Sequence, residues 1–120
     1  MMRLVLLGLL CCNSISFAAK SKEAPSWFCY KGEDNSGQTV EGCERALTAC
    51  QTTTSLLPDF NTTPICYPRN KAWVFSYTHK SSGVVEELAF PDLAACFFTA
   101  EDMARNSDGD VMVSACKSVK

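Results

Sequence analysis

The sequence predicts a small α+β protein in which an antiparallel sheet carries two packed helices and disulfides reinforce the fold. Two observations indicate this fold class. Six cysteines follow a short apolar leader, and a pattern of β-hairpin, helix and return strand occurs twice, about 46 residues apart. A chain of 120 residues buries only a modest core, which disulfides would reinforce. We expect the two copies, residues 19–66 and 67–120, to form one compact domain.

The N-terminal leader has the composition of a secretory signal peptide. Arg3 supplies a positive charge, residues 4–12 form an unbroken apolar run, and small residues follow. The apolar run is too short to span a bilayer. Cleavage after Ala18 would place the small residue Ser16 at the −3 position. The sequence therefore predicts residues 1–18 as a cleaved signal peptide and a secreted or periplasmic mature protein.

The mature chain is mildly acidic and has an even number of cysteines. Removal of the leader takes away Arg3 alone among the charged residues, which leaves 10 basic and 13 acidic residues and a net charge of −3. This charge balance does not predict nucleic-acid binding, for which a basic surface would be expected. No second apolar run is long enough to hold the mature protein in a membrane. An even cysteine count in a small exported chain favours disulfides over free thiols.

The first copy of the pattern begins with the runs "SWFCYKG" and "QTVEGC", which flank the turn formers "EDNSG". This arrangement predicts a hairpin with glycine at the position that requires positive φ. The stretch "CERALTACQ" then predicts a short helix, and the apolar segment "TPICY" predicts a return strand.

The second copy begins with "AWVFSYTHK" and "VVEELAF", which flank "SSG" and predict another hairpin. Trp73, Phe75 and Tyr77 alternate onto one face of its first strand. The stretch "PDLAACFFTAEDMARN" predicts a longer helix, with Pro91 at a first helical position and Asp92 near the positive end of the dipole. The segment "VMVSAC" predicts the final strand.

The two copies align without a gap when residues 27–54 are placed on residues 73–100. The alignment gives eight identities in 28 positions, including Trp27 with Trp73, where about two are expected by chance. We interpret the match as an internal duplication. The alternative is two unrelated segments that share a preference for small residues.

The cysteines that differ between the copies predict the disulfide pairing. Cys29 and Cys43 align with Phe75 and Ala89, so both members of one bridge are missing from the second copy. A bridge is expected to be lost as a pair because a single remaining thiol is reactive in an oxidising compartment. Cys29 and Cys43 also lie symmetrically about the turn, at a cross-strand distance that a disulfide accepts, and the same symmetry predicts Phe75 opposite Ala89. The predicted bridges are Cys29–Cys43, Cys50–Cys66 and Cys96–Cys116.

The predicted core joins aromatic residues of the hairpins to apolar residues at helical spacing. Phe97 and Phe98 stand where the first copy has Gln51 and Thr52, which suggests that the second copy replaces a bridge by packing. The predicted core residues are Trp27, Trp73, Phe75, Leu47, Leu93 and Phe97.

No metal, cofactor or redox motif is evident, since close Cys and His spacings such as C-x-x-C are absent. His79 lies beside the second turn, where a lone histidine is expected to be solvated. The stretch "NSDGD" at residues 106–110 lacks the ligand order of a calcium loop and predicts a turn. Asn61 starts an Asn-Thr-Thr acceptor for glycosylation if the host secretory pathway is eukaryotic.

Three functions are compatible with these features. The first is a non-enzymatic binding module for an unknown protein or surface ligand. The second is an enzyme inhibitor that presents "LLPDFNTTP", residues 56–64, which two prolines and a nearby bridge would preorganise. The third is a small hydrolase that uses carboxylates from the set Asp59, Glu86, Asp102 and Asp108. We expect the first, and therefore no enzymatic activity.

Overall fold

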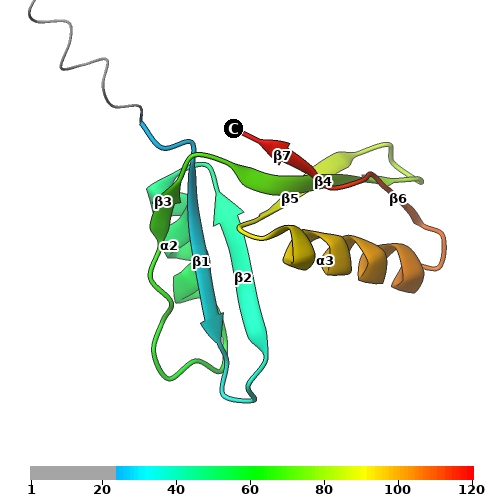
Figure 1. Cartoon of the computed structure of the whole chain (residues 1–120). Helices are drawn as coiled ribbons and strands as arrows, with labels where there is room; N and C mark the ends of the chain where they lie inside the picture. The colour runs from blue at the N-terminus through cyan, green and yellow to red at the C-terminus, as the bar shows by residue number, and fades with distance from the viewer. Residues whose placement is uncertain (1–23) are drawn as a thin grey trace, which may run out of the picture.

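The computed structural model describes residues 24–120 as an α+β protein with antiparallel sheets, two helices and three disulfides (Figure 1). The predicted signal peptide lies outside the described residues.

The first half consists of a three-stranded sheet and one helix. Its second hairpin strand lies at one border, its first strand at the centre and its return strand at the other border, in the order β2-β1-β3. Both pairings are antiparallel. The elements are β1 (Trp27–Glu33), β2 (Thr39–Glu44), α2 (Leu47–Ser55) and β3 (Tyr67–Arg69).

The second half has the same sheet order, with β4 at the centre, β5 at one border, and β6 and β7 following each other along the other border. Figure 1 shows the strands of the two sheets running in different directions, with the sheets meeting near the start of β4. The prediction of a single sheet is therefore wrong, because each return strand pairs with the hairpin of its own half. The elements are β4 (Ala72–His79), β5 (Val85–Phe90), α3 (Leu93–Asn106), β6 (Val111–Val113) and β7 (Lys117–Val119).

The interior forms two apolar clusters. The inter-sheet core lies where the first hairpin meets the start of β4 and contains Trp27, Cys29, Cys43, Ala72 and Val74. The α3 core lies between the other face of the second sheet and α3 and contains Phe75, Phe90, Cys96 and Ala100. The rings of Phe75 and Phe90 stack with their centroids 6.1 Å apart. The second sheet is therefore covered on both faces near β4.

Three predicted core residues are exposed. Leu47, Leu93 and Phe97 keep 41%, 47% and 50% of their surface accessible, so their assignment to the core is wrong. The reason is the rotation of the helices about their axes. Each helix buries its cysteine and the residue four positions later, which in α3 are Cys96 and Ala100, because the disulfide draws that face toward the sheet. The larger side chains therefore remain at the surface.

The disulfides in the structure are the three pairs expected from the sequence. Cys29–Cys43 crosses the first hairpin with its Cα atoms 4.0 Å apart. Cys50–Cys66 connects α2 to the segment before β3, and Cys96–Cys116 connects α3 to the segment between β6 and β7, each with Cα atoms 6.2 Å apart. Each helix is thus covalently attached to the return segment of its own half.

The register of the second hairpin differs by one residue from the prediction. Phe75 lies opposite Leu88, and Ala89 lies opposite Val74, so the predicted pair Phe75–Ala89 is wrong. Because side chains alternate between the two faces of a strand, this shift places Phe75 and Ala89 on opposite faces of the sheet. Phe75 accordingly packs in the α3 core, and Ala89 packs against the inter-sheet core.

The shift originates in the turns. In the first hairpin Asp34 N donates to Gln38 O and closes a three-residue loop, whereas in the second His79 N donates to Val84 O and closes a four-residue loop. The Asp34 carboxylate stabilises the shorter loop by accepting three hydrogen bonds within it. Lys80 stands at the matched position in the sequence and has no acceptor to replace that carboxylate.

The longer turn changes which residues are equivalent in the two halves. Cys29 corresponds to Val74 and Cys43 to Ala89, since both pairs lie directly across their hairpins and border the inter-sheet core. The two tryptophans that match in sequence do not correspond, because Trp27 belongs to the inter-sheet core and Trp73 packs against the α3 core. The shared order of elements is an observation, and the internal duplication remains a prediction.

Candidate functional site

An open apolar groove lies between α3 and the border of the second sheet. We call it the α3 groove. It has a volume of about 400 Å³. One wall is α3, and the other is the chain from the end of β6 to the disulfide at Cys116. The residues that matter for its chemistry are Leu93, Phe97, Glu101, Ala104, Val113 and Cys116.

The sequence shapes this groove through residue size and spacing. Leu93, Phe97 and Glu101 follow each other at four-residue intervals, so they form one ridge along the outer side of α3. The small side chains of Ala100 and Ala104 leave space next to that ridge. The Cys96–Cys116 bridge fixes the separation of the two walls at one end of the groove.

Aromatic residues on α3 are unusually accessible. Phe97 is 50% exposed and Phe98 is 67% exposed, and their rings meet edge to face with centroids 5.6 Å apart. Single exposed apolar side chains are common on soluble proteins, but a contiguous patch beside a groove is typical of an interaction surface. Phe97 lines the groove itself, together with half-exposed Leu93. The sequence signal for this surface was the Phe97-Phe98 pair, which sequence reasoning assigned to packing.

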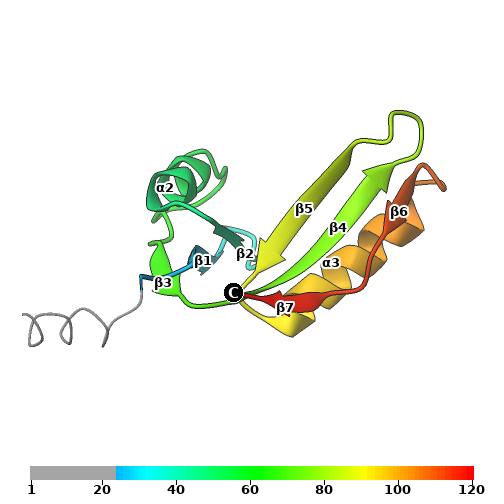
Figure 2. The ribbon, with the colours of Figure 1, turned by 90° about the horizontal axis from the view of Figure 1, so that it is seen from above.

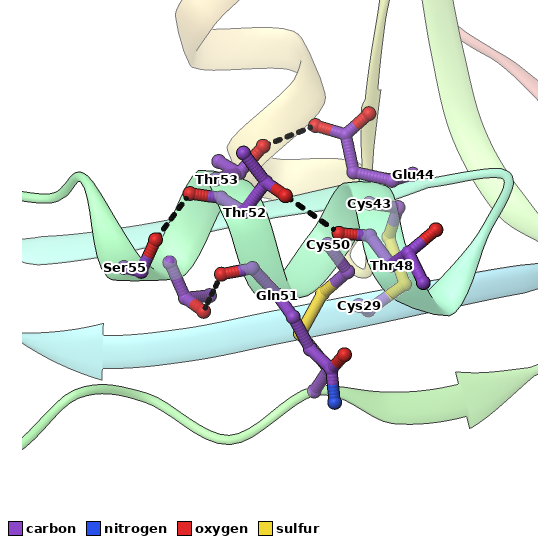
Figure 3. The surroundings of a disulfide bond; sticks show 11 residues. Cys29, Cys43, Glu44, Thr48, Cys50, Gln51, Thr52, Thr53 and Ser55 are labelled. Carbon is purple, nitrogen blue, oxygen red and sulfur yellow. Dashed lines mark hydrogen bonds between the residues drawn. A yellow bond between two sulfur atoms is a disulfide. The ribbon is translucent and has the colours of Figure 1, made fainter.

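Helix α2 provides a direct contrast. Its exposed side chains include Thr48, Gln51, Thr52 and Ser55, and Figure 3 shows them around the helix that carries Cys50. The Thr52 hydroxyl donates to Thr48 O at 2.9 Å, and the Ser55 hydroxyl donates to Thr52 O at 2.8 Å. Each of these hydroxyls donates to a main-chain carbonyl of the preceding turn. The outer face that these four residues form is polar and uncharged. Apart from Leu47 and Ala49 in its first turn, the exposed surface of α2 is polar, whereas α3 exposes Phe97 and Phe98 farther along the helix.

A charged cluster connects the halves where the first hairpin meets the start of α3. Lys31 lies opposite Glu41 in the first hairpin, and its Nζ donates to Asp92 Oδ2 at 3.1 Å. This hydrogen bond holds the pKa of Asp92 below its usual value. Burial, and next the neighbouring Asp92 carboxylate, raise the pKa of Glu41. Within residues 24–120, Glu41 Oε1 is buried without a hydrogen-bond partner, so the protonated form of this carboxyl is favoured.

A second polar cluster lies at the far end of the second hairpin. The Tyr77 hydroxyl donates to Glu86 Oε1 at 2.7 Å, which raises the pKa of Tyr77. His79 Nε2 lies 3.4 Å from Glu86 Oε2, and the Tyr77 and His79 rings meet edge to face. The His79 side chain is 41% exposed, which agrees with the expected solvated position. The cluster is open to solvent and lines none of the grooves described for this chain.

The candidate carboxylates of a hydrolase lie in different parts of the fold. Glu86 is on β5, whereas Asp102 is on α3 and accepts a hydrogen bond from Asn106 Nδ2 at 2.7 Å. Asp59 and Asp108 lie in loops and have positive φ values of 61° and 55°. The structure therefore gives these carboxylates separate surroundings, with no shared pocket among the grooves that it describes.

The 56–64 loop is attached to the first hairpin. Asn35 N donates to Asp59 O at 2.8 Å, and a Cβ atom at Gly32 would lie only 3.0 Å from Pro64 Cγ. The centre of the loop thus rests on its own half, whereas Leu56 and Ile65 at its borders are 75% and 82% exposed. Asn61 is exposed, so the acceptor amide of the glycosylation sequence is accessible.

Among residues 24–120, no group of three or more His, Cys, Asp or Glu side chains has the geometry to hold a metal ion. Neither of the two helices in this part of the chain has the length and apolar character needed to cross a bilayer.

Comparison with protein-family models, with curated proteins and with solved structures finds no match to this chain.

Proposed function

We propose that this chain is an exported, non-enzymatic binding module that contacts its partner through the α3 groove. The observation that carries the proposal is the half-exposed pair Leu93 and Phe97 on the wall of an open apolar groove. The three disulfides support the export part of the proposal, because such bridges persist in oxidising environments. Cleavage of the leader after Ala18 belongs to the same proposal.

Burial of this surface would contribute a measurable part of the free energy of binding. Complete burial of a large apolar side chain contributes about 1.5–3 kcal/mol. Leu93 and Phe97 are each about half exposed, so a partner that covers both would gain roughly the equivalent of one such side chain. That gain corresponds to a factor of about 10–100 in the dissociation constant before polar contacts are added.

A photo-crosslinking experiment tests the proposal. Benzoylphenylalanine is placed at position 97 in one protein and at position 51 in a matched control, since Gln51 is the counterpart of Phe97 on α2. Both proteins are exported by the native host and irradiated. A discrete crosslinked partner from position 97 alone is the expected result. Equal products at both positions, or none at position 97, would contradict a binding role for the groove.

We also propose an inhibitor role for the 56–64 loop as a second candidate. The hydrogen bond from Asn35 N to Asp59 O and the Cys50–Cys66 bridge hold this loop in one shape, which lowers the entropic cost of binding an enzyme. Exposed Leu56 and Ile65 would supply apolar contacts. Assays of the mature protein against a panel of exported proteases decide this role, and no inhibition at micromolar concentration removes it.

A further inference from the structure

The outer edge of β6 offers main-chain groups that the sheet does not use. Within the described chain β6 pairs only with β4. Ser114 N donates to Ser76 O, and Asp110 O accepts from Lys80 N, so residues 110, 112 and 114 direct their main-chain groups inward toward β4. By the alternation of an antiparallel ladder, Val111 and Val113 direct their N–H and C=O groups outward.

This edge runs alongside the α3 groove. Val113 belongs both to β6 and to the wall of the groove, so a chain that paired with the outer edge would lie over the opening. Figure 2 shows β6 and β7 along one border of the second sheet, with α3 beside that border. An extended main chain is the ligand that satisfies a row of outward N–H and C=O groups, and side chains at alternate positions would then enter the groove.

The ridge on α3 sets the spacing of those side chains. Phe97 and Glu101 are four residues apart, and four helical residues advance about 6 Å along the axis. Two residues of a β-strand advance about 6.6 Å. A strand in the groove would therefore place side chain i near Phe97 and side chain i+2 near Glu101.

The charged residues near Glu101 indicate which type of side chain the bound strand would carry at position i+2. The stretch from the middle of α3 to the start of β6 is predominantly acidic, with Arg105 as its single basic residue. Arg105 Nη2 lies 3.4 Å from Glu101 Oε1, so this base neutralises one of the acids and leaves the stretch with an acidic excess. The acidic residues of this stretch are Glu101, Asp102, Asp108 and Asp110. A complementary partner would present a basic side chain at this end of the groove.

We propose that the α3 groove and the outer edge of β6 together bind an extended segment of a partner protein as an added strand. The segment carries an apolar residue that contacts Phe97 and, two positions away, a Lys or Arg that contacts Glu101. This inference rests on the proposed binding function and specifies its partner.

The test uses a phage library of random ten-residue peptides, selected on the exported protein with its three disulfides intact. We expect the selected sequences to share an apolar residue and a Lys or Arg two positions apart. Synthetic copies should bind Phe97→Gln at least tenfold more weakly than the parent. The matched variant Gln51→Ala on α2 should leave their affinity unchanged. Selection of sequences without this pattern overturns the inference.

Two sets of N-methylated peptides separate strand addition from simple insertion of side chains. In one set the even-numbered amides are methylated, and in the other the odd-numbered amides. Because alternate N–H groups of a strand point to opposite edges, we expect one set to lose binding and the other to keep it. Equal behaviour of the two sets overturns strand addition. If binding still depends on Phe97, that result leaves the proposed binding function standing.

Two further results would contradict the strand inference, and they differ in what they mean for the proposed binding function. Selected peptides that bind Phe97→Gln as well as the parent contradict both the strand inference and the proposed role of the groove. Sedimentation that shows a micromolar dimer of the parent, abolished by Phe97→Gln, assigns the groove to a second copy and overturns the peptide inference.

Discussion

Helices α2 and α3 follow matching hairpins in the two halves, and their outer faces differ in chemistry. At matched positions α2 presents Gln51 and Thr52, whereas α3 presents Phe97 and Phe98, and all four residues are exposed. If the phenylalanines compensated for a missing hairpin bridge, they would be buried. Their exposure indicates that the difference concerns what each half presents to other molecules and not how each half is stabilised.

The bridge of the first hairpin has a different counterpart in the second half. Val74 and Ala89 occupy the cross-strand positions equivalent to Cys29 and Cys43, next to the inter-sheet core. On the opposite face of the sheet, Phe75 is 1% exposed and stacks on Phe90. The second half is thus stabilised by aromatic packing beneath α3.

The largest expected effect is therefore the truncation of Phe75. Phe75→Ala should lower the free energy of unfolding by about 3–5 kcal/mol, because a fully buried ring is replaced by a cavity. Urea denaturation measures the loss, with Val85→Thr at a 59% exposed position on β5 as the control. A loss below about 1 kcal/mol would show that the α3 core does not stabilise the second half.

Removal of a helix-linking bridge should have the next largest effect in either half. Replacing both Cys96 and Cys116 by Ala opens a loop with a sequence separation of 20 residues, and the same change at Cys50 and Cys66 opens one of 16. Each should cost about 3 kcal/mol from loop entropy. Thermal unfolding of the two double variants tests the comparison. A variant that melts with the parent would assign no structural role to its bridge.

A new bridge tests which residues of the second hairpin replace Cys29 and Cys43. Val74→Cys combined with Ala89→Cys should form a disulfide on export, because these residues lie directly opposite each other. The gain from closing the loop is at most about 3 kcal/mol, and the loss of the buried Val74 side chain reduces it. Peptide mapping of the exported protein detects the bridge.

The control for this experiment is Phe75→Cys combined with Ala89→Cys. These side chains point to opposite faces of the sheet, so the two thiols should remain unpaired with each other. A bridge in the control and none in the Val74–Ala89 variant would show that the register of the second hairpin is one residue away from that described.

The sequence predicted the positions of strands and helices and the disulfide pairs. It did not predict the register of the second hairpin or the rotation of the helices. Strand and helix positions follow from turn formers and periodicity, and the disulfide pairs follow from which cysteines are missing in the second copy. The one-residue shift at Phe75 depends on the side chain at the turn, Asp34 against Lys80, which a gap-free alignment treats as equivalent. The exposure of Phe97 depends on the rotation of α3, which the Cys96–Cys116 bridge sets in three dimensions. The predicted Cys96–Cys116 bridge already brought the walls of the groove together, but the opening between them depends on that rotation, which the sequence does not show.

The smallest expected effect concerns the charged cluster of Lys31, Glu41 and Asp92, which connects the two halves. The pKa of Glu41 is raised in the folded protein, so the folded state binds this proton more tightly than the unfolded chain does. Ionisation of Glu41 therefore lowers stability as pH rises through the folded pKa, and the penalty is absent below the unfolded value, near 4.3. Asp92 has the opposite sign, because its lowered pKa gives stability above about pH 3.9 that is lost as pH falls through the folded value.

Glu41→Gln should consequently stabilise the protein slightly at pH 7, since an uncharged amide of the same shape removes the cost of a partly buried carboxylate beside Asp92. The gain should shrink as the pH is lowered toward 4, where the carboxyl of the parent becomes protonated. Glu33→Gln, at an exposed position on the same hairpin, is the matched control and should show no such trend. Urea denaturation of the parent and both variants at pH 4 and pH 7 measures the difference. A Glu41→Gln protein that is less stable than the parent at pH 7 would show that the ionised carboxylate, paired with Lys31, holds the two halves together.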